Sequence, residues 1–480
     1  MPKPASQTCS HAILQTTPSA FAHYAGFKPQ TTLQLAAAAT KSGRIPPSSK
    51  KIAEEEVKML SATFPAPLVL PWDDLNLDPD CPGQSFRSWL HEKARNKLTQ
   101  KRPVIYVASV PEIGDEVGFM RDWTRPNIAS SSTDPEQLEL PEAADVIEYL
   151  QAFYHGMRVK PFPGRLRFTS WTQSSSTSKS TRKSKSQTQA ENEKYVGLAL
   201  NSSVTRIRTR PTPSSSSSTP LFPSQLNLND LLDVAISILP SDAHALLLLT
   251  SHDLYEDEAD DFCCGRAYGG SRVAIVSSAR YNPLLDSADK SLDPAHMWPA
   301  SHCTAYIDSL LAAEDIHAEP ASPSTSLSKH ADPSKHADPL DGIQAAVSAT
   351  SSLPPPTTLT SSSASSSLTN LWFSRLARTA AHELGHCFAL AHCVYYACSM
   401  QGTASIAEDV RQPPYLCPVC LAKLAYAVSG ELRGEEGDEE KTAYVKERYE
   451  ALRRVCKKWS DVGMFAGFGA WLDVRMEKLE

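Results

Sequence analysis

Hydrophobic and polar residues alternate along this chain in two patterns, one typical of strands and one typical of helices. Short runs of branched apolar residues predict strands at 102–110, 164–171, 245–255 and 271–281. Apolar residues three and four positions apart predict amphipathic helices at 85–100, 142–157 and 228–239. Because strands and helices alternate in sequence, we expect an α/β or α+β fold.

Two long stretches, 171–220 and 318–370, break this pattern. Both are rich in Ser, Thr and Pro, and such a composition cannot bury enough apolar area to offset the conformational entropy of an ordered chain. We therefore expect two disordered insertions within one domain that runs from 61 to 480. The N-terminal segment, 1–60, is expected to be partly ordered.

The insertions also contain a repeat and a basic run. The repeat SKHADP-SKHADP carries His330 and His336, which we interpret as a duplication in an unconstrained loop and not as metal ligands. The basic run could be a nuclear localisation signal, but we favour a solvated Ser/Lys loop. Its residues are Lys179, Arg182, Lys183 and Lys185.

Charge and hydropathy argue against several classes of partner. The formal net charge of the 480 residues is −7, without the clustered Lys and Arg that phosphate binding requires. The apolar run at 12–14 is too short for a secretory signal, and the longest one, 243–250, falls far below the roughly 18 residues of a membrane-spanning helix. We expect an intracellular monomer, cytoplasmic or nuclear, that binds neither nucleic acid nor membranes.

The stretch AHELGHCFALAHCVYYACSM, 381–400, combines histidines and cysteines at spacings that suit metal binding. His382 and His386 are four residues apart on a predicted helix, 371–390, so both imidazoles project from one face and one zinc ion can bind both. Glu383 completes the pattern H-E-x-x-H. Its carboxylate can act as a general base on a zinc-activated water and then return the proton to the leaving amine.

Further ligands follow this helix. His392 lies ten residues after His382 and supplies a third histidine for the catalytic zinc. Clustered cysteines in a reducing compartment more often bind metal than form disulfides. Two pairs have spacings suited to a closed tetrahedral zinc site, namely Cys393, Cys398, Cys417 and Cys420. Cys387 is predicted to be a core residue, and no paired spacing is evident for Cys9, Cys81, Cys263, Cys264, Cys303 and Cys456.

These motifs together resemble the archaemetzincins, a family of metzincin-like zinc metallopeptidases. The resemblance rests on the three histidines running directly into the four cysteines, with Met400 just after the second cysteine, and weaker likeness covers most of the chain outside the insertions. It implies a compact metzincin-like domain with a twisted sheet, an edge strand over the substrate cleft and an active-site helix. It also implies two zinc ions per chain, one catalytic and one structural, and a methionine turn at Met400 beneath the catalytic zinc.

One position departs from the family pattern. Metzincins have Gly seven residues after the first histidine, where the chain turns towards the third ligand, and this chain has Ala389. A left-handed conformation at a non-Gly residue costs about 1 kcal/mol, which is small against the free energy of zinc binding. Either Ala389 accepts this cost or the turn has another geometry.

The leading hypothesis is therefore a zinc peptidase acting on peptides or small proteins, whether as an aminopeptidase or as an endopeptidase. The main alternative is a catalytically silent zinc-binding scaffold or interaction protein. Glu383 favours the enzyme, because a carboxylate there is not needed to bind the metal. A nucleic-acid-binding zinc ribbon is disfavoured, since the residues around the second cysteine pair supply only Arg411 and Lys423.

Overall fold

The described residues form two compact units, each assembled from separate stretches of the chain. The computed structural model describes residues 9, 11–128, 138–171, 194–213, 220–314, 316, 341–353, 361–435 and 437–479. The first unit comprises 1–93, 291–360 and 390–480, and the second comprises 94–290 and 361–389. The predicted domain over 61–480 includes parts of both units, and its being one domain stays a prediction.

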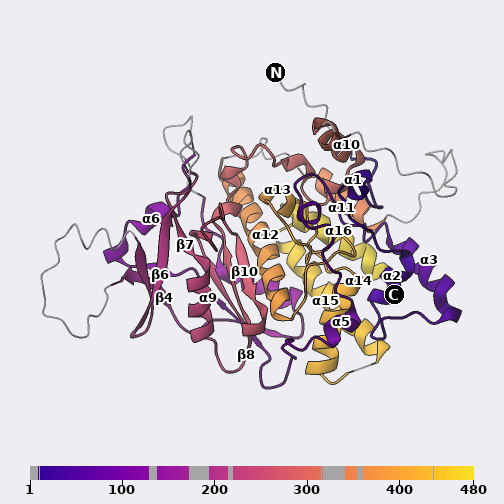
Figure 1. Ribbon diagram of the computed structural model, residues 1–480, viewed down its shortest axis with the longest axis horizontal. Helices are drawn as coiled ribbons and strands as arrows, with labels where there is room; N and C mark the ends of the chain where they lie inside the picture. Colours follow the sequence, from indigo (N-terminus) through magenta and orange to yellow (C-terminus); the bar gives the residue numbers. More distant parts are fainter. Residues whose placement is uncertain are drawn as a thin grey trace, which may run out of the picture. The chain divides into compact units, whose positions relative to one another are not determined.

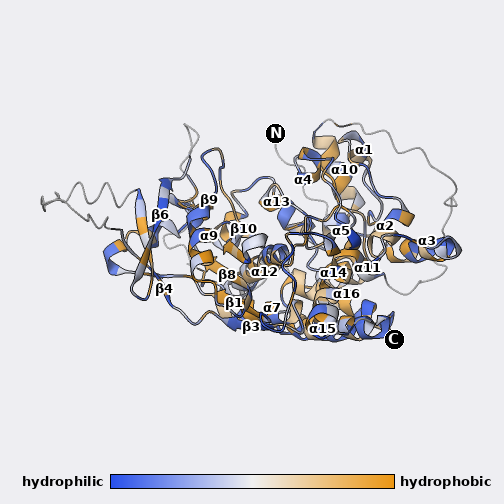
Figure 2. Cartoon of the chain, turned by 60° about the horizontal axis from the view of Figure 1, so that its bottom comes forward, coloured by the Kyte–Doolittle hydropathy of each residue, from blue (hydrophilic) through white to orange (hydrophobic). Residues whose placement is uncertain are grey.

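The second unit has an α/β core around a five-stranded sheet of order β10-β11-β8-β1-β3. Figure 1 labels β8 and β10 of this sheet. Its strands are β1 Val104–Ala108, β3 Arg158–Pro161, β8 Ala243–Thr250, β10 Gly265–Tyr268 and β11 Val273–Ser277. Neighbouring strands are parallel except β10, which is antiparallel to β11 and forms one edge. β8 is buried along its whole length, as expected for a central strand covered on both faces, and the part of the sheet labelled β8 is coloured mainly as hydrophobic in Figure 2.

A second, six-stranded sheet of order β2-β4-β5-β6-β7-β9 belongs to the same unit. Its strands are β2 Glu112–Ile113, β4 Leu166–Ser170, β5 Tyr195–Leu200, β6 Ser203–Pro211, β7 Ser224–Asn227 and β9 Asp253–Tyr255. The antiparallel hairpin of β5 and β6 lies inside the predicted insertion 171–220. That prediction was wrong for 194–213, where Val196, Leu198 and Ile207 contribute to the core. The basic run lies outside the described residues.

Three longer helices of this unit are α7 Ala143–Phe153, α9 Leu228–Ser237 and α12 Ser361–Cys387, and a short one is α6 Met120–Trp123. α12 packs along β8, β10 and β11 and against α7. It is longer than the predicted helix 371–390 at its start, since it begins inside the predicted insertion 318–370. A row of small residues permits its close approach to the sheet, because Ala377, Ala380 and Ala381 are fully buried.

The regular elements among the described residues of the first unit are helices, and these residues form no named strand. The helices are α1 Ala20–Tyr24, α2 Thr32–Ala38, α3 Lys50–Leu60, α4 Asp74–Leu77, α5 Phe86–Leu90, α10 Thr304–Ala313, α11 Gly342–Ser351, α13 Ile406–Asp409, α14 Pro418–Ala425, α15 Asp438–Lys458 and α16 Gly463–Glu477, with a π-helical stretch at Tyr426–Leu432. Of the predicted helix 85–100, only the part in α5 forms.

α11 corrects the prediction of disorder across 318–370. Its side chains Ile343, Ala346 and Val347 are buried, and the helix packs on α16. The close approach requires Gly342, because a Cβ there would lie 2.9 Å from Cδ1 of Trp471. The repeat with the two histidines at 330 and 336 lies outside the described residues. No helix in the described part of the chain is both long and apolar enough to span a membrane.

Candidate functional site

The H-E-x-x-H motif occupies the last two turns of α12, and polar contacts within the second unit fix the helix before the motif begins. Trp372 Nε1 donates to the carbonyl oxygen of Ser278 at 2.7 Å. The guanidinium of Arg375, itself buried, binds both carboxylate oxygens of Asp286 at 2.8 and 2.7 Å. Paired donors and acceptors of this kind fix both the rotation and the position of a helix.

The C-terminal end of α12 is packed just as closely. A Cβ at Gly269, in the turn between β10 and β11, would lie 2.2 Å from the carbonyl oxygen of His386, so only glycine fits there. Phe388 stacks on Tyr154 with ring centroids 5.0 Å apart and 4° between the planes. The histidines therefore project from a helix end that cannot shift independently of the sheet.

The side chains of His382 and His386 meet on one face of α12, as the spacing predicts. Their Nε2 atoms are 3.1 Å apart, and the rings are nearly perpendicular at 81°. Two nitrogens bound tetrahedrally at about 2.0 to 2.1 Å from one zinc would be about 3.4 Å apart. Both rings are partly exposed, so the pair fits a zinc ion that a substrate could reach.

Glu383, between these histidines, is buried against the edge strand of the sheet. A Cβ at Gly265, the first residue of β10, would lie 3.2 Å from Cγ of Glu383, and the glutamate is 8% exposed. Its carboxylate is therefore held beside the strand. Cys387, at the end of the helix, is fully buried, and this burial raises the pKa of its thiol, as expected of an unreactive core residue.

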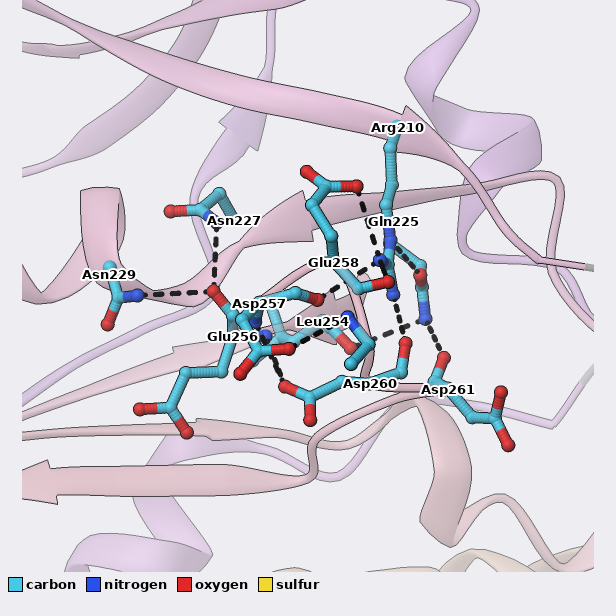
Figure 3. A network of polar contacts seen from close by, with 11 residues as sticks. Arg210, Gln225, Asn227, Asn229, Leu254, Glu256, Asp257, Glu258, Asp260 and Asp261 are labelled. Atoms are coloured by element: carbon cyan, nitrogen blue, oxygen red, sulfur yellow. Dashed lines mark hydrogen bonds and ion pairs between the residues drawn. The ribbon is translucent and has the colours of Figure 1, made fainter.

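The acidic loop 256–261 that leads into β10 is held by donors from the second sheet (Figure 3). The Arg210 guanidinium donates to the carbonyl oxygens of Asp257 at 3.1 Å and Glu258 at 3.3 Å. Gln225 Nε2 donates to the carbonyl oxygen of Asp261 at 2.7 Å. These hydrogen bonds satisfy backbone carbonyl oxygens of the loop. The loop is therefore held in one defined position, and with it the start of β10 beside Glu383.

The turn after the helix has the conformation that the family's glycine would take. The amide of Ala389 donates to the carbonyl oxygen of His386 at 2.9 Å, and φ of Ala389 is +59°, in the left-handed region. Of the two possibilities that the sequence left open, Ala389 accepts the left-handed conformation, at a cost of about 1 kcal/mol.

His392, the third predicted histidine, belongs to the first unit, and its segment is anchored there. The amide of Ala391 donates to Oε1 of Gln84 at 3.1 Å, and the same oxygen accepts from Lys423 Nζ at 2.8 Å. Nδ1 of His392 faces Gly402, where a Cβ would lie 2.7 Å away from it. That His392 joins His382 and His386 on one ion stays a prediction.

A carboxylate that the sequence did not single out lies at the same place. A Cβ at Gly402 would be 2.2 Å from Oδ2 of Asp74, so the carboxylate and the imidazole of His392 both approach this glycine. A carboxylate near a ligand histidine fixes the orientation and tautomer of the ring. Asp74 could not be found from motif spacing, because it is far from His392 in sequence.

The four predicted cysteines come together in the first unit, where all are buried. Their sulfur atoms lie within 4.8 Å of one another, and Sγ of Cys393 is 3.6 Å from Sγ of Cys417. Thiolates bound tetrahedrally at about 2.3 Å from zinc would be about 3.8 Å apart. All the cysteines of the chain, each a described residue, are free thiols. The cluster therefore fits a closed structural zinc site.

Backbone donors complete this cluster. The amides of Met400 and Cys417 donate to Sγ of Cys398 at 3.5 and 3.3 Å. Cys417 precedes α14 and Cys420 lies in its first turn, where the helix dipole favours negative charge. Burial raises the pKa of the Cys398 and Cys417 thiols well above the ordinary value, whereas hydrogen bonds from the neighbouring thiols lower the pKa of Cys393. A bound cation would favour the thiolate form of Cys398 and Cys417.

Met400 is fully buried in the first unit, between the two cysteine pairs in sequence. Its carbonyl oxygen accepts from the amide of Cys393 at 2.7 Å, which closes the loop 393–400. One short loop therefore carries two of the cysteines and Met400, and His392 directly precedes it. The predicted position of Met400 beneath a catalytic ion remains a prediction.

The segment that carries these motifs is similar to known proteins. Residues 362–426 match peptidase family M54. Archaemetzincin-2 of Rattus norvegicus is 26% identical over 222 residues, which cover 46% of this chain and 43% of the relative. This chain is related to the archaemetzincins.

One further relative and one solved structure also align with this chain. Archaemetzincin-2 of Homo sapiens is 46% identical over 61 residues, 13% of this chain and 17% of the relative. These two matches thus span between 17% and 43% of the relatives' lengths. The crystal structure of archaemetzincin from Methanopyrus kandleri aligns with 69% of this chain and 97% of its own, at 16% identity and a TM-score of 0.29.

Proposed function

We propose that this archaemetzincin relative is a zinc-dependent peptidase. The observation that carries the proposal is the pair of imidazoles of His382 and His386, with nitrogens 3.1 Å apart, beside the buried carboxylate of Glu383. His392 would complete the ligand set, since it follows the left-handed turn at Ala389 by three residues. The peptidase family that matches this segment supports the same reaction class.

Each residue would then have a defined role in hydrolysis. Bound zinc would lower the pKa of water to near 7 and polarise the scissile carbonyl. Glu383 would take the proton of the attacking water and return it to the leaving amine. The exposed side of β10, an edge strand next to Glu383, could pair with the backbone of an extended peptide. The substrate class we propose is therefore peptides or small proteins.

A catalytically silent zinc scaffold is the weaker proposal. It was suggested by the alanine in place of the family's glycine, but Ala389 has the left-handed conformation that glycine would supply. In a peptidase, Glu383 would be the general base. In a silent scaffold, the same buried carboxylate would have no role and would only add the cost of burying a charge.

Removing the metal should separate these two proposals. We expect 1,10-phenanthroline to abolish peptide hydrolysis, and zinc added after dialysis to restore it, because the partly exposed histidines give up their ion more readily than the buried cysteines do. Zinc content and hydrolysis should be measured on the same samples. Hydrolysis that persists after all the zinc has left would contradict the peptidase proposal.

Gly402→Ala should weaken catalysis by displacing His392. The new Cβ would lie 2.7 Å from Nδ1 of His392 and 2.2 Å from the Asp74 carboxylate, so one of them must move. We expect kcat/KM to fall by about ten- to hundredfold, the scale of a catalytic group misplaced by about 1 Å. Gly469→Ala is the matched control, because its Cβ would make only an ordinary contact of 3.5 Å with Cys456. Equal activity of the two variants would refute this role of Gly402.

A further inference from the structure

A second cluster of histidine and cysteine lies in the first unit, where the start of the chain crosses residues 293–304. Leu14 and Cys303 form an antiparallel bridge. On either side of it, the amide of Gln15 donates to the carbonyl oxygen of His302 at 2.7 Å, and the amide of Thr304 donates to that of Ile13 at 3.0 Å. These backbone bonds fix the residues just before Ile13 over the segment that precedes α10.

The crossing brings three metal-binding side chains together. One ligand atom each from Cys9, His11 and His296 lie within 4.8 Å of one another. The two imidazole rings meet edge to face, with centroids 5.0 Å apart and 84° between their planes. Sγ of Cys9 is also 3.2 Å from Sγ of Cys303, so a second thiol borders the cluster. Cys9, His11 and His296 thus lie close enough to surround one ion, and Cys303 adjoins the cluster through Cys9.

The orientation of His296 indicates that something binds there. His296 is 8% exposed, stacks on Tyr306 with centroids 4.2 Å apart, and places Nδ1 2.8 Å from Oδ2 of Asp293. A carboxylate on Nδ1 holds the proton at that nitrogen and leaves the lone pair on Nε2. Nε2 of His296 and Nε2 of His11 are both buried and have no hydrogen-bond partner in the part of the chain that the structure describes.

Such buried nitrogens cost free energy unless a ligand satisfies them. His11 also has a left-handed φ of +50°, which is unfavourable for a residue other than glycine. Two imidazoles with one or two thiolates are a donor set that zinc prefers, and a carboxylate behind one imidazole is the usual second partner of a zinc-bound histidine. A single bound cation would account for all of these features.

We propose that Cys9, His11 and His296 bind a zinc ion, beside the thiol of Cys303. This site is separate from the histidines of α12 and from the four-cysteine cluster, so the proposal does not rest on peptidase activity. The ion would link the start of the chain to the segment before α10 and would act as a structural zinc. Spacing along the sequence could not reveal it, because Cys9 and His11 are far from His296 and Cys303.

The direct test is the zinc content of the purified full-length chain, prepared anaerobically with reductant and measured by mass spectrometry. His296→Gln should contain one zinc equivalent less than the wild type. His23→Gln is the matched control, because this histidine is exposed and lies in the same unit. An unchanged zinc content in His296→Gln would overturn the proposal.

A second variant covers the case in which His296→Gln fails to fold. Cys9→Ser lies before the first bridged residue, so it should keep the circular dichroism of the wild type and still lose one zinc equivalent. In the cobalt-substituted protein, the same variant should reduce the thiolate-to-cobalt charge-transfer absorption. Wild-type zinc content in Cys9→Ser, or a Cys9–Cys303 disulfide that persists in reductant, would show that the cluster is not a metal site.

Discussion

Cys417→Ser should empty the four-cysteine site and markedly destabilise the first unit. The substitution removes one of four buried thiols whose sulfur atoms lie within 4.8 Å of one another. Structural zinc contributes about 10 to 16 kcal/mol of apparent binding free energy in small zinc domains, of the same order as the whole stability of a domain. Losing even about 4 kcal/mol of this would lower the melting temperature by roughly 10 °C, which calorimetry would detect.

Cys456→Ser is the matched control for this experiment. Cys456 is 2% exposed, lies on α15 in the same unit, and belongs to no metal-binding group among the described residues. It should lose some packing energy but keep the zinc content of the wild type. Equal zinc loss in the two variants, or none in either, would refute a structural zinc at the four cysteines.

The same Cys417→Ser variant tests the coupling of the two predicted zinc sites. His392 and Cys393 are adjacent in sequence, and the amide of Cys393 donates to the carbonyl oxygen of Met400. Loosening this loop should displace His392, so peptide hydrolysis should fall although no catalytic residue has changed. A variant that loses the second zinc but hydrolyses peptides at the wild-type rate would show that the two sites are independent.

Glu383→Gln should lower kcat/KM by about 10² to 10⁴, the usual contribution of a general base. The amide keeps the size of the side chain but cannot accept the proton of the attacking water. Zinc content should stay at the wild-type level, because His382 and His386 are unchanged. His382→Ala is the comparison, since it should lose the catalytic zinc as well. Unchanged turnover in Glu383→Gln would exclude this residue from the mechanism.

The features that the sequence predicted best are those that depend on the local spacing of residues. The strand at β8 and the helices α7 and α9 follow from apolar spacing alone, and a separation of four residues was enough to place His382 and His386 on one face. The cysteine cluster was also predictable, because its two pairs are near in sequence and share one environment.

The rest depends on tertiary structure. α11 lies in a Ser- and Pro-rich stretch, where composition predicts disorder, but Ile343 and Val347 find a partner in α16. The approach of Asp74 to Gly402, and that of Cys9 to His296, join residues far apart in sequence. The conformation of Ala389 was likewise undecidable from sequence, because alanine permits either geometry at a small cost.

The most direct test of the peptidase proposal is the digestion of a defined peptide mixture by the zinc-loaded protein, followed by mass spectrometry. The wild type should generate new peptide termini, and Glu383→Gln with the same zinc content should generate none or very few. The positions of the new termini would also distinguish an aminopeptidase from an endopeptidase. Cleavage by neither protein, or equal cleavage by both, would contradict the proposal that this chain hydrolyses peptides with Glu383 as general base.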